Sequence, residues 1–153
     1  MDRGDLFMKS HFIQADADQW QSVATKIGTA DWNGAKHLSE MMLTDQLHDW
    51  EGIIYLEEKG EILAFCSIMK KDIVDTDLYT PYIAVVYVFP EYRGQFLTKY
   101  LMKHAEEELQ KVGFDEVFLV TPLGDFYEKL NYKAINRMYD RFDRLLTVYQ
   151  KEL

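Results

Sequence analysis

Apolar and polar positions follow a strand pattern and then a helix pattern through the middle of the chain. Residues 82–89 form an apolar run with no charged or amide side chain, which is typical of a strand buried on both faces in the middle of a sheet. Pro90 ends this strand, because proline has no backbone N–H to donate to a neighbouring strand. Beyond Gly94 the apolar positions recur with the spacing of one helical face, and Gly113 provides the stop. These positions are Leu97, Leu101, Ala105, Leu109 and Val112. The pattern predicts a strand, a tight turn and a helix that starts at the turn.

Shorter patterns on both sides of this unit complete the expected fold. Further strands are predicted at 11–15, 52–57, 62–69, 116–121, 132–140 and 145–149. Further helices are predicted from residue 16 or 18 to 27, at 33–47 and at 124–130. Gly60 turns a hairpin, and the central strand, helix and next strand form a right-handed parallel crossover. We therefore expect a single α/β domain over 1–153, with a mixed, mostly antiparallel sheet, one parallel pair at its middle and a loose segment at 1–9.

The turn between the central strand and its helix is a candidate anion site. The first N–H groups of a helix have no partners within the helix and carry the positive end of its dipole, so they bind phosphate readily. Arg93 adds a positive charge, and Gly94 allows a ligand to approach the backbone. A plain surface turn with a chance arginine is the alternative.

Two blocks of the sequence resemble the GNAT family of N-acetyltransferases. Residues 88–94 (Val-Phe-Pro-Glu-Tyr-Arg-Gly) are similar to the acyl-CoA pyrophosphate motif of this family, Arg/Gln-x-x-Gly-x-Gly/Ala after a central strand. Residues 126–132 (Phe-Tyr-Glu-Lys-Leu-Asn-Tyr) resemble the family's Phe-Tyr-Glu-Lys-Leu-Gly-Phe block. The resemblance implies the acyl-CoA N-acyltransferase fold, with acetyl-CoA as co-substrate. It also implies direct transfer of the acetyl group to a primary amine of a small molecule or peptide.

The resemblance also implies roles for particular residues. In this family the parallel strands splay apart, the pantetheine arm of acyl-CoA pairs with the central strand, and the diphosphate lies on the amides of the turn. Carried over to this chain, the acetyl-CoA-binding residues are Val86, Tyr87, Val88, Arg93, Gly94, Gln95, Phe96, Leu97 and Thr98. Tyr127 matches the family tyrosine that protonates the departing thiolate as a general acid; packing alone is the alternative. The two early helices flank the acceptor groove, which places Trp32, Glu40 and Asp45 near the amine; the alternative, favoured for each residue taken alone, is a core tryptophan and solvated carboxylates.

Two departures from the family pattern affect the expected chemistry. Phe96 and Thr98 replace the glycines of the motif; we expect helical backbone angles there, which suit any L-residue, with some crowding of the anion. Ala84 stands where many members carry a glutamate base, so either the amine arrives neutral or a carboxylate assists. The candidate carboxylates are Glu40, which we rank first, Asp75 and Asp77. The alternative function is a CoA-binding sensor or interaction module on the same fold that has lost catalysis.

Charge and composition narrow the classes of function and partner. The chain has 153 residues, is 48% hydrophobic and carries a net charge of −9, so it can bury a sizeable core. This acidity disfavours nucleic acid, whose phosphates need Lys and Arg, and suits a cationic amine. Exposed hydrophobic edges would allow a homodimer.

The remaining composition argues against metals, disulfides and membranes. The histidines are scattered, and the loop aspartates lack a metal-binding spacing, so no metal is expected. Cys66 is the single cysteine, which excludes an intrachain disulfide and suits a reducing cytoplasm. No apolar run reaches the roughly 20 residues of a membrane helix, and the amino terminus has no secretory pattern.

Overall fold

The computed structural model describes residues 8–74, 76–122 and 125–153. Its centre is a seven-stranded mixed sheet with the order β1-β2-β3-β4-β5-β7-β6. The strands are β1 (Met8–Ile13), β2 (Gly52–Glu58), β3 (Glu61–Met69), β4 (Tyr82–Val88), β5 (Glu116–Thr121), β6 (Lys133–Tyr139) and β7 (Leu145–Glu152). The helices are α1 (Trp20–Ile27), α2 (Asn33–Leu43) and α3 (Leu97–Val112), with short 3-10 helices at Pro90–Tyr92 and Tyr127–Leu130. The β4–β5 pair is parallel and the other strand pairs are antiparallel. The expected α/β fold with one central parallel pair is confirmed.

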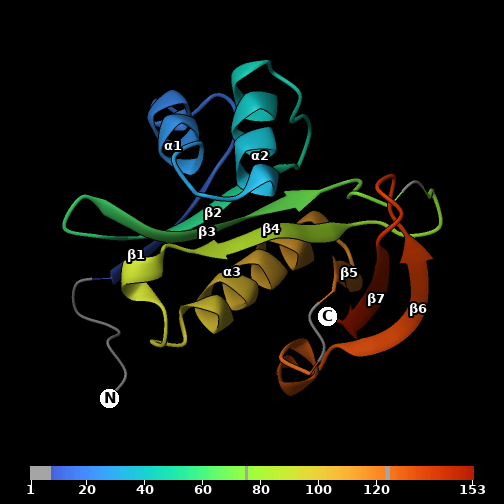
Figure 1. Ribbon diagram of the computed structural model, residues 1–153. Helices are drawn as coiled ribbons and strands as arrows, with labels where there is room; N and C mark the ends of the chain where they lie inside the picture. Colours follow the sequence, from blue (N-terminus) through green and yellow to red (C-terminus); the bar gives the residue numbers. More distant parts are fainter. Residues whose placement is uncertain (1–7, 75, 123–124) are drawn as a thin grey trace.

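Helices cover the two faces of the sheet. In Figure 1, α1 and α2 lie on one face of β2, β3 and β4, and α3 lies on the opposite face. The two early helices are joined by a buried hydrogen bond of 2.6 Å from the Ser39 hydroxyl to the Ala24 carbonyl. On the other face, α3 buries the predicted stripe Leu97, Leu101, Ala105 and Leu109, whereas Val112 is exposed. The central strand is therefore covered on both faces along much of its length, which explains its apolar sequence.

Some boundaries differ from those predicted. Met8 and Lys9 pair with β2, so the first strand begins earlier than expected and these two residues are not loose. Residues 1–7, also expected to be loose, lie outside the described part. The second helix ends at Leu43, because the chain turns at Asp45, which has a φ of 55°. The apolar Leu47 was predicted to lie on the inner face of this helix. It is buried, but it belongs to the loop that follows the helix.

Candidate functional site

A β-bulge interrupts the middle of β4. Ser67 of β3 pairs with Ala84 and Phe65 pairs with Tyr87, so the single residue between them on β3 faces both Val85 and Val86. Val85 has a φ of 55°, which is rare for a β-branched residue. A bulge leaves its extra residue outside the hydrogen-bond ladder. The centre of the sheet therefore presents irregular backbone, where polar main-chain groups can meet a ligand.

The bulge also decides which face each side chain of β4 occupies. Ala84, Val85 and Tyr87 pack with the cluster under α1 and α2. Val86 and Val88 are half-buried and pack with the cluster beneath α3. Without the extra residue, the alternation of β4 would place Ala84 and Val85 on opposite faces.

The parallel strands separate immediately beyond their first pair. Tyr82 and Phe118 form the one registered pair between β4 and β5, and the Phe118 N–H donates to the Pro81 carbonyl at 2.9 Å. Beyond this point β5 stays paired with β7 over its whole length. The β4 edge from Val85 to Val88 is thus not registered with β5, and an extended ligand can add to it as a strand.

The turn after β4 differs from the sequence prediction at Phe96. Arg93 is extended, Gly94 has a φ of +83°, and Phe96 has a φ of 59° and a ψ of 27°. The expectation of helical angles at Phe96 was wrong, because this residue caps α3 in the left-handed conformation, which favours glycine. Its side chain is 72% exposed, so the ring extends into solvent. The expected crowding of the anion by this ring stays a prediction.

Arg93 connects the turn to the end of β4. Its Nε donates to the Val88 carbonyl at 2.9 Å, and its guanidinium lies 5.3 Å from the centroid of the Tyr87 ring. Thr98 lies in the first turn of α3, where N–H groups lack helical partners. The turn, the β4 edge and the start of α3 therefore bring the predicted acetyl-CoA residues together. Their arrangement suits a ligand with an extended arm and an anionic group.

Tyr127 lies on the α3 side of the sheet. It is buried in the same cluster as the half-buried Val86 and Val88, and its ring is 6.2 Å from Tyr132 and 6.5 Å from Tyr149. Burial is the main cause that raises the pKa of Tyr127 to about 12. Among the described residues its hydroxyl makes no hydrogen bond. Tyr127 therefore holds its proton at neutral pH.

The predicted carboxylates are not gathered at β4. Glu40 is exposed on α2, at a position remote from the buried stripe of that helix. Asp77 is exposed and forms an ion pair of 2.8 Å with Lys71, and Asp75 lies outside the described residues. Ala84 is buried and carries no proton acceptor. The assignment of Glu40 stays a prediction.

Asp72 is one of the loop aspartates that the sequence analysis considered only as possible metal ligands. Burial raises its pKa to about 6, although its Oδ1 accepts a hydrogen bond of 2.7 Å from the Ile73 N–H. The nearby Tyr82 hydroxyl is buried without a hydrogen-bond partner in the described part of the chain. Burial and the Asp72 charge together raise the pKa of Tyr82 to about 12. No local pattern could have distinguished Asp72 from its neighbours, because its burial depends on how the 70–80 loop lies on the sheet.

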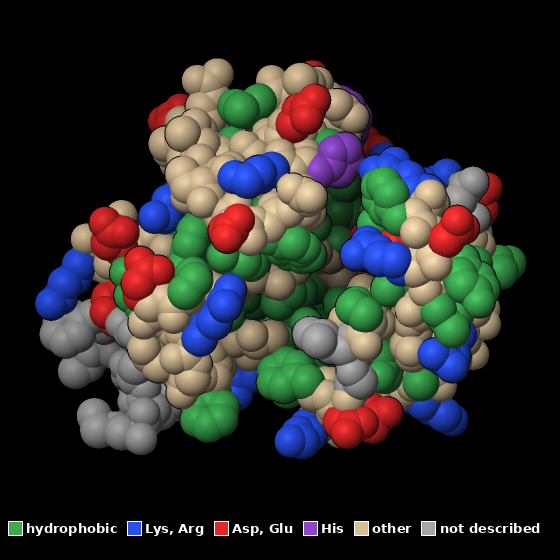
Figure 2. All heavy atoms as spheres, in the orientation of Figure 1, with side chains coloured by type: hydrophobic (Ala, Val, Ile, Leu, Met, Phe, Trp, Pro, Cys, Tyr) green, Lys and Arg blue, Asp and Glu red, His purple; other side chains and the backbone are tan. Residues whose placement is uncertain are grey.

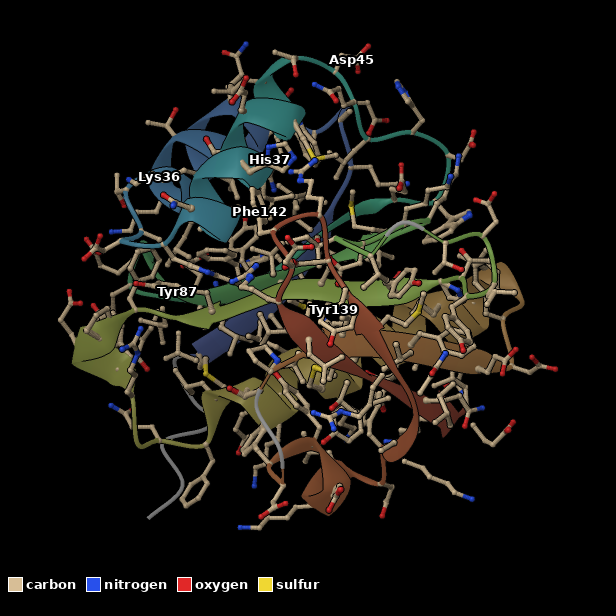
Figure 3. The ribbon with its side chains drawn as sticks, turned by 45° about the vertical axis from the view of Figure 1, so that its right-hand side comes forward. Lys36, His37, Asp45, Tyr87, Tyr139 and Phe142 are labelled. Atoms are coloured by element: carbon tan, nitrogen blue, oxygen red, sulfur yellow. The ribbon has the colours of Figure 1, made fainter. Side chains whose placement is uncertain are left out.

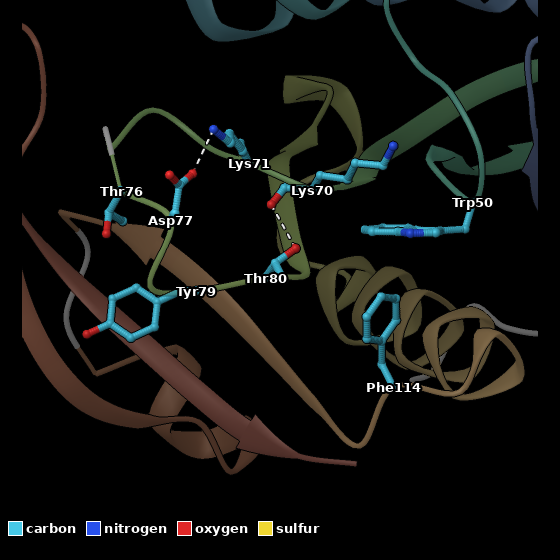
Figure 4. A pocket seen from close by; sticks show the side chains of 8 residues that line it. All are labelled: Trp50, Lys70, Lys71, Thr76, Asp77, Tyr79, Thr80 and Phe114. Carbon is cyan, nitrogen blue, oxygen red and sulfur yellow. Dashed lines mark hydrogen bonds and ion pairs between the residues drawn. The ribbon is translucent and has the colours of Figure 1, made fainter.

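A cavity of about 350 Å³ lies where the 70–80 loop meets the end of α3 (Figure 4). It is lined by Trp50, Lys70, Lys71, Thr76, Asp77, Tyr79, Thr80 and Phe114. Several of its polar groups already have partners: the Thr80 hydroxyl donates to the Lys70 carbonyl, Lys71 forms an ion pair with Asp77, and Lys70 forms one with Asp49. None of the predicted acetyl-CoA residues lines it, so it is separate from the candidate site.

Two general features of the described residues bear on the class of protein. They contain no group of three or more His, Cys, Asp or Glu side chains placed to hold a metal ion. None of the helices in that part of the chain is long and apolar enough to cross a membrane.

Comparisons with solved structures agree with this fold. Among solved structures, the fold is similar to an aminoglycoside 6'-acetyltransferase of type Ii, with a TM-score of 0.70 and 16% identity over 94% of this chain and 96% of that one. It is also similar to a spermidine N-acetyltransferase mutant of Vibrio cholerae, with a TM-score of 0.65 and 8% identity over 95% and 93%. A further similar structure, from Salmonella typhimurium, contains its cofactor acetyl-CoA; its TM-score is 0.65, with 18% identity over 95% and 94%.

The sequence comparisons identify the family. An uncharacterised N-acetyltransferase of Chlorobaculum tepidum is 29% identical over 84 residues, which cover 53% of this chain and 49% of that protein. The match thus spans about half the length of the curated relative. The profile described as "Acetyltransferase (GNAT) family" matches residues 16–132, more than half of the chain. The chain therefore belongs to the GNAT acetyltransferase family.

Proposed function

We propose that the protein is an acetyl-CoA-dependent N-acetyltransferase that acts on a primary amine of a small molecule or peptide. The observation that carries this proposal is the bulged edge of β4, unregistered with β5 beyond Tyr82, beside the start of α3. Bound acetyl-CoA supplies an activated acetyl thioester. Relatives of the same fold that act on spermidine or aminoglycosides support an amine acceptor.

The residues present fit this co-substrate. The main chain of Val86, Tyr87 and Val88 offers an unregistered edge for the pantetheine arm, since β-strand addition needs main-chain groups more than particular side chains. The amides between Arg93 and Thr98 would hold the diphosphate. Gly94, Gln95 and Leu97 complete the residues that we propose bind acetyl-CoA.

The chain supplies two groups for the chemistry. A backbone N–H at the bulge polarises the thioester carbonyl and stabilises negative charge on its oxygen. The Tyr127 hydroxyl protonates the thiolate as it leaves, a role that suits a group still protonated at neutral pH. Because Ala84 cannot accept a proton, the amine enters the site neutral. Glu40 as a water-mediated base stays a weaker part of the proposal.

Two measurements test the function. Isothermal titration calorimetry should show that CoA binds, and binding should weaken when Gly94→Pro removes an amide and its left-handed turn. Thiol release from acetyl-CoA with a panel of amines should then show turnover. Tyr127→Phe should reduce kcat by roughly a hundredfold, at the low end of general acid catalysis, and leave CoA affinity nearly unchanged.

Tyr132→Phe is the matched control for Tyr127→Phe. Tyr132 is also buried in the cluster beneath α3, and its hydroxyl donates to Glu106 Oε2 at 2.7 Å. Loss of the Tyr132 hydroxyl should lower the free energy of unfolding but leave kcat nearly unchanged. CoA binding without thiol release for any amine would instead favour the sensor alternative, and the absence of CoA binding would exclude both functions. A homodimer and a cytoplasmic location stay predictions.

A further inference from the structure

Four aromatic rings connect the early helices to the end of β4, and we call them the aromatic array: Trp32, Phe65, Tyr87 and Phe89. The Tyr87 ring stacks on Trp32 with centroids 6.0 Å apart and on Phe65 at 5.5 Å, and it meets Phe89 edge-on at 5.3 Å. In Figure 3, Tyr87 lies on the side of β4 toward α2. Trp32 is 42% exposed, and Figure 2 shows hydrophobic side chains around a hollow below the helical pair. The array therefore joins the loop between α1 and α2 to the strand that carries the candidate site.

Arg93 lies against this array at the open edge of β4. Its guanidinium carbon is 5.3 Å from the centroid of the Tyr87 ring, and its Nε donates to the Val88 carbonyl at 2.9 Å. The Phe89 N–H donates to the Leu63 carbonyl of β3, so the main chain of Phe89 faces β3. Because neighbouring residues of a strand direct their main-chain groups to opposite edges, the Val88 carbonyl faces away from β3. The Arg93 guanidinium thus lies at the edge that is not registered with β5.

The guanidinium has donors left for an anion. It carries five N–H donors, and the contact with the Val88 carbonyl uses the one on Nε. Within the described residues, no carboxylate forms an ion pair with Arg93. A guanidinium can stack on a ring and bind phosphate oxygens in paired hydrogen bonds. Its contact with Tyr87 restricts its motion in advance, so less conformational entropy is lost when an anion binds.

Trp32 is held in turn by the start of α2. It is the N-cap residue of this helix, and its ring packs on the backbone of Gly34. A Cβ added at Gly34 would lie 2.8 Å from Cζ2 and 2.9 Å from Cε2 of Trp32, much closer than carbon atoms normally pack. Alanine is the better residue inside a helix, so the contact with Trp32 accounts for the glycine at this position.

We propose that Trp32 is a positioning residue for acetyl-CoA: by fixing the Tyr87 ring, it holds the Arg93 guanidinium where that group meets the diphosphate. This inference rests on the acetyltransferase function proposed above. It gives Trp32 a role on the co-substrate side of the site, whereas the family resemblance places it near the amine. Loss of Trp32 loosens Tyr87 and so frees Arg93, whereas loss of Arg93 leaves Trp32 nothing to position.

A double-mutant cycle measured by calorimetry with CoA tests this order. Trp32→Ala should weaken CoA binding about fivefold, the size of one aromatic or cation–π contact. Trp32→Phe keeps a ring and should retain most of the affinity. Arg93→Ala should weaken binding about tenfold, because a charge-assisted contact is lost. The double variant should bind CoA no more weakly than Arg93→Ala alone, since Trp32 acts through Arg93.

The salt dependence of CoA binding separates positioning from a general structural role. Salt screens an exposed contact between a guanidinium and a diphosphate, so affinity of the wild type should fall between about 0.05 and 0.5 M salt. Arg93→Ala and Trp32→Ala should both reduce this fall, because both remove the same charged contact. A structural defect at Trp32 would lower the affinity but leave its salt dependence as in the wild type.

Gly34→Ala perturbs the array without removing a ring. The added methyl group displaces the Trp32 ring, so CoA binding should weaken as in Trp32→Ala, and the two changes together should weaken it no further. Trp50→Ala is the matched control. Trp50 is also a partly exposed tryptophan and packs on Phe114 with ring centroids 5.0 Å apart, but it lines the separate cavity. Its loss should change neither the affinity for CoA nor the salt dependence.

The outcomes distinguish this inference from the function on which it rests. Unchanged CoA affinity in Trp32→Ala, or additive losses in the double variant with Arg93→Ala, would overturn the positioning role and leave the proposed function standing. A weaker affinity with the salt dependence of the wild type would overturn it as well. Absence of CoA binding in the wild type would show that the failure lies in the proposed function itself.

Discussion

Replacement of Asp72 by asparagine should stabilise the protein at neutral pH. Burial raises the pKa of this carboxyl from an ordinary value of 3.8 to about 6, so the folded state disfavours the charged form. Asparagine has the same shape and keeps the acceptor for the Ile73 N–H at 2.7 Å. It removes only the charge, beside a Tyr82 hydroxyl that lacks a partner among the described residues.

The size of the effect follows from the two pKa values. Since the folded state binds the Asp72 proton more tightly than the unfolded state, the wild type is relatively stable below pH 3.8 and loses stability as pH rises toward 6. The difference between the two values amounts to on the order of 3 kcal/mol at pH 7, about 1.5 at pH 5 and about 0.5 at pH 4. Asp72→Asn should gain up to these amounts in free energy of unfolding.

Urea denaturation at pH 7, 5 and 4 measures this gain. Asp77→Asn, in the same loop but exposed and paired with Lys71, is the control and should show no such gain. The reasoning fails if Asp72→Asn is no more stable than the wild type at pH 7. It also fails if the gain is equal at all three pH values, because the effect of removing the charge must shrink as the pH approaches the pKa of the carboxyl in the unfolded state.

Three further substitutions test the site and its supports. Phe96→Gly should match or exceed the wild type in CoA affinity by calorimetry, since glycine adopts φ 59° without strain, whereas Phe96→Ala should not improve it. Ser39→Ala should lower the free energy of unfolding, measured by urea denaturation, by about 1 kcal/mol, because it leaves the buried Ala24 carbonyl without its 2.6 Å hydrogen bond. Glu106→Gln should cost about 1–3 kcal/mol, since the Glu106 carboxylate accepts from the Tyr132 hydroxyl at 2.7 Å and from Lys151 at 3.0 Å; an unchanged melting temperature would contradict it.

The order and type of the elements could be predicted from the sequence. The apolar run at 82–89 marked the central strand, and the spacing from Leu97 to Leu109 marked its helix. These patterns succeed because the pleat of a strand and the turn of a helix repeat within a few residues. The turn at Gly94 could likewise be placed, because residues adjacent in sequence form it.

Three features needed the tertiary structure. The bulge at Val85 depends on the register with β3, and the left-handed Phe96 depends on the chain turning from a 3-10 helix into α3. Asp72 shifts its pKa only because of what covers it.

The stacked rings of Trp32 and Tyr87 show the same division most clearly, with centroids 6.0 Å apart. The two residues are far apart in sequence, and Trp32 stands in no recognisable motif. Hydrophobic periodicity tells which side of an element is buried, so it indicated the order of strands and helices, and two short blocks of sequence indicated the family. The location of the acetyl-CoA site stays a prediction. Which side chains meet is decided by sheet order and by how the helices lie on the sheet, and these arise from packing between distant segments.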